Sequence, residues 1–324
     1  MIESNRCSDG RKPVTGLLLS ALLATSFFAV YAEQSVRASE ESSEVWVSRV
    51  SDTSGLDAAA LRLSSAAAFV ADDRGRRLYA KHSRDVKPIA SITKLMTAMV
   101  VLDAGLPMDE PIRILEVDRD TLRHSRSRLR TSLATLSRRE LLTIALMSSE
   151  NRAAAALGRT SLPGRTGAFV EAMNRKARSL GMWQSRFADP SGLDGRNRST
   201  AEDLVKMLQA AARYPFIRKA TTTAHTTVSP YASGLTLDYR NTNPLIRNAN
   251  ADWDIGLSKT GYLNEAGRCL AMQVRIGGRG FYIVLLDASG KLTPTGDSNR
   301  VRKWLESELR KPQYRTTAGR ADRG

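Results

Sequence analysis

Three short motifs carry residue types that could perform acyl transfer through a serine nucleophile. The first is Ser91-Ile92-Thr93-Lys94, in which positions i and i+3 would share one face of a helix, so that the lysine amine can reach the serine hydroxyl. A lysine must be neutral to accept that proton, and burial or a neighbouring cation lowers its pKa. Alone, the pattern Ser-x-x-Lys is expected about once in a chain of this length and would indicate a surface helix.

Two further motifs make the pattern more specific. Ser149-Glu150-Asn151 follows an apolar helical run, and Lys259-Thr260-Gly261 lies in a strand-like segment. A Lys-Thr-Gly match is expected by chance in about one chain in twenty. The three motifs occur in a fixed order, at a helix start, in an interhelical loop and in a strand. This order matches the signature of penicillin-recognising serine enzymes.

Other routes to catalysis have less support. The three histidines, His82, His124 and His225, lie neither near a Gly-x-Ser-x-Gly turn nor at the spacing of metal ligands. Cys269 alternates within an apolar strand-like run, which favours a buried small side chain over the alternative of a redox group. We therefore predict no metal site and no cofactor.

The elements that must position these motifs follow the two hydrophobic periodicities. Helical spacing dominates residues 102–218, whereas strand-like runs lie on both sides of that region. Strands are predicted at residues 65–70, 77–81, 256–262, 269–276 and 281–287, and helices at 88–101, 139–147, 152–157, 168–180, 200–212 and 297–309. The predicted fold class is α+β, with an antiparallel sheet of about five strands, flanked by terminal helices, and an inserted all-α subdomain.

The N-terminus indicates export. Residues 1–32 combine a basic start, an apolar run and a small-residue site that ends at Ala32, as a secretory signal peptide does, and an uncleaved anchor helix is the alternative. The remaining chain is predicted to divide into a polar linker with little structure (33–60), a catalytic domain (61–311, with an α/β part at 61–101 and 219–311 and a helical subdomain at 102–218) and a loose basic tail (312–324).

The charge of the chain favours anionic partners. The 324 residues include 49 Lys+Arg and 33 Asp+Glu, which gives a formal net charge of +16, and their hydrophobic fraction of 42% excludes a disordered or polytopic membrane protein. This charge favours electrostatic contact with anionic envelope polymers or a membrane surface. The arginine-rich stretch at residues 119–130 contains no Phe, Tyr or Trp, so we predict a solvated basic face there and no nucleic-acid binding.

The sequence resembles the low-molecular-mass penicillin-binding proteins, in particular the periplasmic D-alanyl-D-alanine endopeptidases of the penicillin-binding protein 7 type. The resemblance extends over roughly residues 65–288 and implies a penicillin-binding/β-lactamase-like fold. It rests on four stretches: PIASITKLMTAMVVLDAG (88–105), LMSSENRAAAALGR (146–159), FADPSGLDGRNRSTAEDL (187–204) and GLSKTGYLNEAGRCLAM (256–272).

The resemblance implies a catalytic role for several residues. Ser91 would be the acylated nucleophile and Lys94 its general base. Ser149 would pass the proton toward the leaving amine, assisted electrostatically by Lys259. The backbone amides of Ser91 and Tyr262 would form the oxyanion hole.

The same resemblance implies the substrate contacts. Asn151 would bond the substrate backbone, and Lys259 with Thr260 would hold the carboxylate next to the scissile bond. Gly261 would leave room for the substrate to pair along the strand edge. Because Lys259 would lie near Lys94, we also expect the second cation to lower the pKa of the general base.

Two departures from related enzymes affect the expected chemistry. Glu150 stands where β-lactamases of the Ser-Asp-Asn type have Asp, and we expect its side chain to point away from Ser91. Glu171 falls in a helical stretch, which does not match the loop that places a deacylating water in class A β-lactamases. We therefore expect penicillin to inhibit the protein rather than to be hydrolysed.

The predicted function is that of an exported, periplasmic serine D,D-peptidase that cleaves D-alanyl-diaminopimelate cross-links of peptidoglycan stem peptides, with β-lactams as covalent inhibitors. A D-alanyl-D-alanine carboxypeptidase is the first alternative, because the carboxylate beside the scissile amide sits on a D-centre in both substrates. A non-catalytic basic protein that binds envelope polymers is the second.

Overall fold

The computed structural model describes residues 56–248 and 252–311 of the chain. The predicted signal peptide (1–32), most of the predicted linker (33–60) and the predicted tail (312–324) lie outside the described residues. Within the described ranges, no helix combines the length and the apolar character that a membrane span requires.

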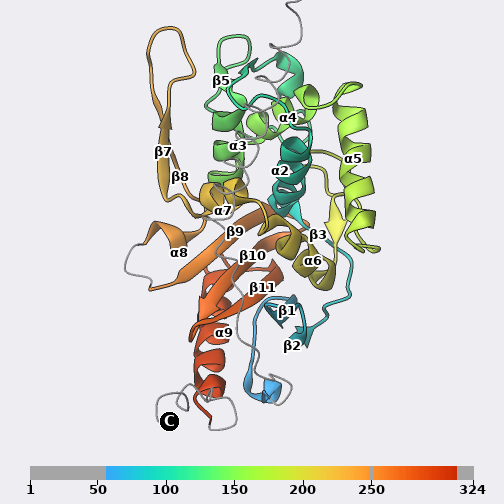
Figure 1. Cartoon of the computed structure of the whole chain (residues 1–324), viewed down its shortest axis with the longest axis vertical. Helices are drawn as coiled ribbons and strands as arrows, with labels where there is room; N and C mark the ends of the chain where they lie inside the picture. The colour runs from blue at the N-terminus through green and yellow to red at the C-terminus, as the bar shows by residue number, and fades with distance from the viewer. Residues whose placement is uncertain (1–55, 249–251, 312–324) are drawn as a thin grey trace, which may run out of the picture. The chain divides into compact units, whose positions relative to one another are not determined.

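A five-stranded antiparallel sheet is built from both ends of the described chain, as the sequence predicts (Figure 1). Its β1 pairs with β11 from Ala67 opposite Leu286 to Asp72 opposite Phe281, which joins the N-terminal hairpin to the last strand. The strand order is β2 (Arg77–Lys81), β1 (Ala67–Asp72), β11 (Arg279–Ala288), β10 (Gly267–Ile276) and β9 (Asp254–Leu263). One edge of the sheet is therefore formed by β9, which carries the Lys-Thr-Gly motif.

Both faces of the sheet are covered, which explains the continuous apolar runs of its central strands. All six residues of β1 are buried. Alternate residues of β1 and β11 face two different cores, one shared with the helical part and one beneath α9 (Thr293–Leu309). The residues of α9 buried in that second core are Val301, Trp304 and Leu305.

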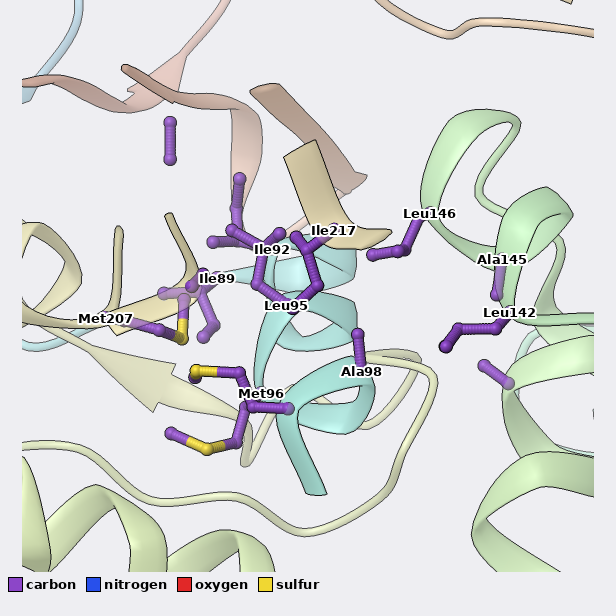
Figure 2. Packing of buried hydrophobic residues seen from close by; sticks show 14 of the residues in the cluster. Ile89, Ile92, Leu95, Met96, Ala98, Leu142, Ala145, Leu146, Met207 and Ile217 are labelled. Atoms are coloured by element: carbon purple, nitrogen blue, oxygen red, sulfur yellow. The ribbon is translucent and has the colours of Figure 1, made fainter. Parts of the chain in front are cut away.

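The helical part is arranged around α2 (Thr93–Asp103), of whose 11 residues nine are buried. A helix that is apolar on all sides must be enclosed by other elements. Figure 2 shows side chains of α2 lying between Leu142, Ala145 and Leu146 on one side and Met207 on the other. The surrounding helices are α3 (Arg138–Met147), α4 (Asn151–Thr160), α5 (Arg165–Ser179), α6 (Ala201–Ala211) and α7 (Pro215–Thr222).

The helix predicted from residue 88 begins later than expected. Lys87–Pro88 form a short strand, β3, that pairs with β6 (Arg198–Ser199), and the Ile89 amide donates to Asn197 O at 3.0 Å. A 3-10 turn, η2 (Ala90–Ile92), follows before α2 starts at Thr93. These pairings with residues 197–199 tie down the segment before the helix, so Ser91 lies in a turn and not in the α-helix.

The inserted subdomain is mostly helical and not all-α as predicted. Two short strands within it, β4 (Pro111–Arg113) and β5 (Thr135–Ser137), pair with each other and are joined by a long, mostly irregular segment. A hairpin, β7 (His225–Val228) and β8 (Leu237–Arg240), follows the insertion and extends away from the sheet (Figure 1). These strands are short and largely polar, so the apolar periodicity did not indicate them. The remaining short elements are η3 (Glu116–Asp118) and α8 (Pro244–Arg247).

The end of the predicted linker is also structured. Ala58–Ala60 form a 3-10 turn, η1, which is capped by the Asp57 side chain through the Ala59 amide at 2.9 Å. Trp304 Nε1 donates to Asp57 O at 2.8 Å, and the Asp57 amide donates to Glu308 Oε2 at 3.2 Å. Packing on α9 therefore orders residues that a polar composition alone would leave loose.

A buried carboxylate fixes the chain before β1 to α9. Asp297 is fully buried and accepts hydrogen bonds from the Ser64 amide at 3.0 Å and from the Ser65 amide and Oγ, both at 2.7 Å. Arg300 Nη1 donates to the same carboxylate at 2.6 Å. One side chain thus satisfies backbone donors more than 200 residues away along the chain.

The substitution Asp297→Ala should destabilise the protein, because it leaves the buried amide and hydroxyl of Ser65 without an acceptor. We expect the free energy of unfolding to fall by about 2–4 kcal/mol in urea denaturation monitored by circular dichroism. Asp109→Ala is the matched control, since the Asp109 side chain is 86% exposed, and it should change stability by less than about 0.5 kcal/mol. Equal effects of the two substitutions would contradict the anchoring role of Asp297.

Candidate active site

Ser91 lies in the η2 turn, which two close backbone contacts hold in place. A Cβ added to Gly192 would lie 2.1 Å from Ala90 O, and one added to Gly261 would lie 2.9 Å from Ile89 O and 3.2 Å from Ser91 N. The loop that follows residue 189 and the edge strand β9 therefore both approach the turn at a distance that only glycine permits. This arrangement brings the Ser91 amide next to β9, where the oxyanion hole is expected.

The amine of Lys94 lies within hydrogen-bond distance of three oxygens. Its Nζ is 2.9 Å from Ser91 Oγ, 2.8 Å from Asn151 Oδ1 and 2.5 Å from Ser191 O. A neutral amine matches this set, because two N–H groups can donate to the amide and carbonyl oxygens while the lone pair accepts the Ser91 hydroxyl proton. The geometry thus suits a lysine that acts as a base toward Ser91.

Burial favours that neutral form. The Lys94 side chain is 1% exposed, and the loss of hydration lowers its pKa to about 8, although the charges of Asp189 and Glu150 act in the opposite direction. A lysine with a pKa of about 8 is partly neutral near physiological pH, whereas an ordinary lysine is not.

The second motif forms the connection between α3 and α4. Ser149 has a left-handed backbone (φ 64°), and Asn151 is the first residue of α4. Both ends of the Asn151 amide are bonded: Oδ1 accepts from Lys94, and Nδ2 donates to Ser125 Oγ at 3.0 Å. Glu150 caps α4 by accepting from the Arg152 amide at 3.1 Å, so its carboxylate is occupied at the helix start.

Lys259 is the second buried amine of the site. Its side chain is 1% exposed, and burial, followed by the charge of Lys94, holds its pKa well below the usual value. Its Nζ donates to Thr260 O at 3.0 Å, and Thr260 Oγ1 donates to Thr242 Oγ1 at 2.6 Å. Burial, and not the expected charge of Lys259, lowers the pKa of Lys94, whereas the charge of Lys94 does lower the pKa of Lys259.

The predicted residues converge on one pocket with a volume of about 940 Å³. The two lysines are buried behind this pocket, where water cannot compete for their amines. The predicted residues that line it are Ser91, Ser149, Asn151, Thr260, Gly261 and Tyr262. The buried Cys269 also lies at its wall, and burial raises the pKa of this thiol to about 12, which keeps it protonated.

Sequence reasoning missed several residues that hold the site together. Ser125 bonds Asn151 but lies in the arginine-rich stretch predicted to be only a solvated face. Thr242 bonds Thr260 and carries no sequence signal of its own. Ser191 O, in the Asp-Pro-Ser-Gly turn, accepts a hydrogen bond from Lys94 Nζ. That turn lies inside one of the four stretches of resemblance, which was the signal that could have identified it. In the described ranges, no group of three metal-ligating side chains is placed to hold a metal ion.

Comparisons with known proteins agree with this geometry. Residues 55–290 match the family model described as D-alanyl-D-alanine carboxypeptidase. The chain is 48% identical over 246 residues to the D-alanyl-D-alanine endopeptidase of Pseudomonas aeruginosa and 44% identical to that of Escherichia coli, with 76% of this chain and 78% of each relative covered. The crystal structure of penicillin-binding protein D2 from Listeria monocytogenes, in its cefotaxime-bound form, superposes with a TM-score of 0.63 at 30% identity, covering 75% of this chain and 98% of that one.

The substitution Gly261→Ala should separate β9 from the turn that carries Ser91, because the added methyl group would press against Ile89 O and Ser91 N. We expect labelling of Ser91 by fluorescent penicillin to slow by about 10- to 100-fold. Gly167→Ala is the matched control, since an added Cβ in α5 meets nothing within 4 Å, and it should label at the unmutated rate. Normal labelling of folded Gly261→Ala would show that the close approach is unimportant.

Proposed function

The chain belongs to the D-alanyl-D-alanine carboxypeptidase family of serine peptidases, and on that premise we propose that it cleaves D-alanyl-diaminopimelate cross-links in peptidoglycan through an acyl-enzyme on Ser91. The observation that carries this proposal is the buried amine of Lys94, 2.9 Å from Ser91 Oγ at the floor of an open pocket. Residues 61–311 form the proposed peptidase domain.

Acylation begins when Lys94 removes the proton of Ser91 as Oγ bonds to the D-alanyl carbonyl carbon. The Ser91 and Tyr262 amides stabilise the negative charge that develops on the carbonyl oxygen. The tetrahedral intermediate collapses when the C–N bond breaks, and Ser149 transfers to the leaving nitrogen a proton that Lys94 replaces. The ester on Ser91 is then hydrolysed by water, with Lys94 again acting as the base, which regenerates the hydroxyl.

Substrate binding also affects the protonation of Lys259. In the described part of the chain, no carboxylate lies within ion-pair distance of Lys259 Nζ, whose recorded partner is Thr260 O. A substrate carboxylate at Lys259 and Thr260 supplies that counter-ion and favours the charged form of Lys259.

The two curated relatives described above are named endopeptidases, which supports cleavage of cross-links as the main reaction. Removal of a terminal D-alanine is the second candidate, because the matching family model carries the carboxypeptidase description. Both reactions place a D-centre carboxylate at Lys259 and Thr260. They differ only in the size of the leaving group.

We also propose that the protein acts in the periplasm after removal of residues 1–32, where cleavage of cross-links would contribute to cell shape. Peptidoglycan lies outside the cytoplasm, so an enzyme of this family must be exported to reach it. The excess of basic residues would support electrostatic contact with anionic envelope polymers or a membrane surface.

Ser91→Ala should abolish the reaction, because no other group can form the ester. With a cross-linked muropeptide dimer as substrate, mass spectrometry should detect monomers with the unmutated protein and none with the variant. Loss of one alanine from an intact dimer would instead identify a carboxypeptidase and leave the site residues unchanged.

Fluorescent penicillin should label the unmutated protein and not Ser91→Ala, and the label should persist. The reason is that Glu171 pairs with Arg175 on the exposed surface of α5, not at the pocket, and is therefore not placed to activate a deacylating water. Rapid turnover of a chromogenic β-lactam would contradict this expectation. Absence of labelling on folded protein would favour the non-catalytic, polymer-binding alternative.

The rate of acylation should rise with pH, because only the neutral form of Lys94 accepts the Ser91 proton. The second-order rate constant for benzylpenicillin should increase by about tenfold per pH unit below the pKa of about 8 and level off above it. Stopped-flow measurements between pH 6 and 9 test this. A rate that falls as the pH rises through this range would exclude Lys94 as the base.

A further inference from the structure

A charged rim borders one side of the pocket, where three segments of the chain meet. The Arg123 guanidinium pairs with the Glu265 carboxylate on the β9–β10 turn, and Arg123 Nε donates to Leu193 O at 3.2 Å. Glu265 lies against the loop after residue 189, since a Cβ added to Gly195 would come within 2.7 Å of Glu265 Oε1. Both paired side chains remain 37% exposed, and Arg123 lines the pocket.

Arg268, shortly after that turn, is a second cation at the wall of the pocket. Its guanidinium carbon lies 4.4 Å from the centre of the Tyr262 ring, and both residues line the pocket together with Arg123. Stacking on an aromatic ring holds a guanidinium in place while leaving its N–H groups able to bond a carboxylate. Arg123, Glu265 and Arg268 are called the charged rim below.

The direction of β9 shows which part of a substrate reaches the charged rim. Under the proposed function, Lys259 and Thr260 hold the carboxylate of the leaving amino acid, on one side of the bond that Ser91 attacks. The strand continues past Ser91 through Tyr262 to the turn at residue 265, in the opposite direction. The acyl donor, which lies on the other side of the scissile bond, must therefore extend toward the charged rim.

The chemistry of the acyl donor complements these charges. In a D-alanyl-diaminopimelate cross-link, the residue before the D-alanine is the diaminopimelate of the donor stem itself. Its side chain ends in a D-centre that carries both an ammonium and a carboxylate. A purely anionic group would be repelled by Glu265, and a purely cationic group by the two arginines, whereas a zwitterion can satisfy both.

We propose that the charged rim is a binding subsite for this zwitterionic end of the donor diaminopimelate. Arg268 and Arg123 bind its carboxylate, and Glu265 binds its ammonium, with the Tyr262 ring beneath the methylene chain. This inference rests on the proposed function and adds to it the part of the substrate that selects a donor stem.

The test compares three cross-linked muropeptide dimers: one unmodified, one with the donor side-chain carboxylate amidated, and one with the donor side-chain amine acetylated. We expect kcat/KM of the unmutated protein, measured by mass spectrometry, to be about 10- to 100-fold higher for the unmodified dimer than for the amidated one. Arg268→Gln and Arg123→Gln should each reduce that ratio, and Glu265→Gln should reduce the preference over the acetylated dimer.

Arg119→Gln is the matched control, since Arg119 lies in the same loop and pairs with Glu116 on the surface. It should keep the unmutated preferences. Equal rates on all three dimers by the unmutated protein would overturn the subsite and leave the proposed function intact. Cleavage of none of them would overturn the proposed function and the subsite with it. The comparison of the three dimers uses the unmutated protein, so it tests the subsite even if a variant fails to fold.

Discussion

The burial of an amine beside a serine hydroxyl is the constraint on which the rest of this structure depends. Lys94 must lose its hydration to be neutral, yet it must remain in contact with Ser91, which faces the open pocket. The apolar helix α2 provides the loss of hydration, because packing on all its sides excludes water from the Lys94 side chain. The oxygens of Ser91, Asn151 and Ser191 meet the second requirement, because they provide partners without adding a charge in contact with the amine.

Close backbone contact is the means by which distant segments meet at this point. Ser91 and Lys259 lie on segments separated by the whole helical insertion, and they come together because Gly192 and Gly261 let backbone approach backbone. Gly192 is required for a second reason, because residues that carry a side chain rarely adopt its φ of +80°. Close packing of three backbone segments, the η2 turn, the loop at Gly192 and β9, therefore positions the side chains of the site.

The sequence predicted the sheet and the large helices, because these elements bury long apolar runs whose period is readable. It also predicted that the residues of the three motifs lie together at one site, as they do. It could not predict the contacts that orient them: Ser125 and Thr242 sit in polar stretches, where the sequence pattern does not distinguish a bonded hydroxyl from a solvated one. The same reason explains why η1 and the short strand pairs were missed, since tertiary contacts such as that of Trp304 with Asp57 decide them.

The pairing of β1 with β11 has a consequence for how the molecule acquires its activity. Ser91 is made early in synthesis, but the strands that complete the sheet and carry Lys259 are made near the end. Contacts between residues so far apart along the chain close slowly and late in folding. A nascent or unfolded chain therefore contains the proposed nucleophile without its environment, and we expect reactivity toward cell-wall peptides to arise only as the last strands join the sheet.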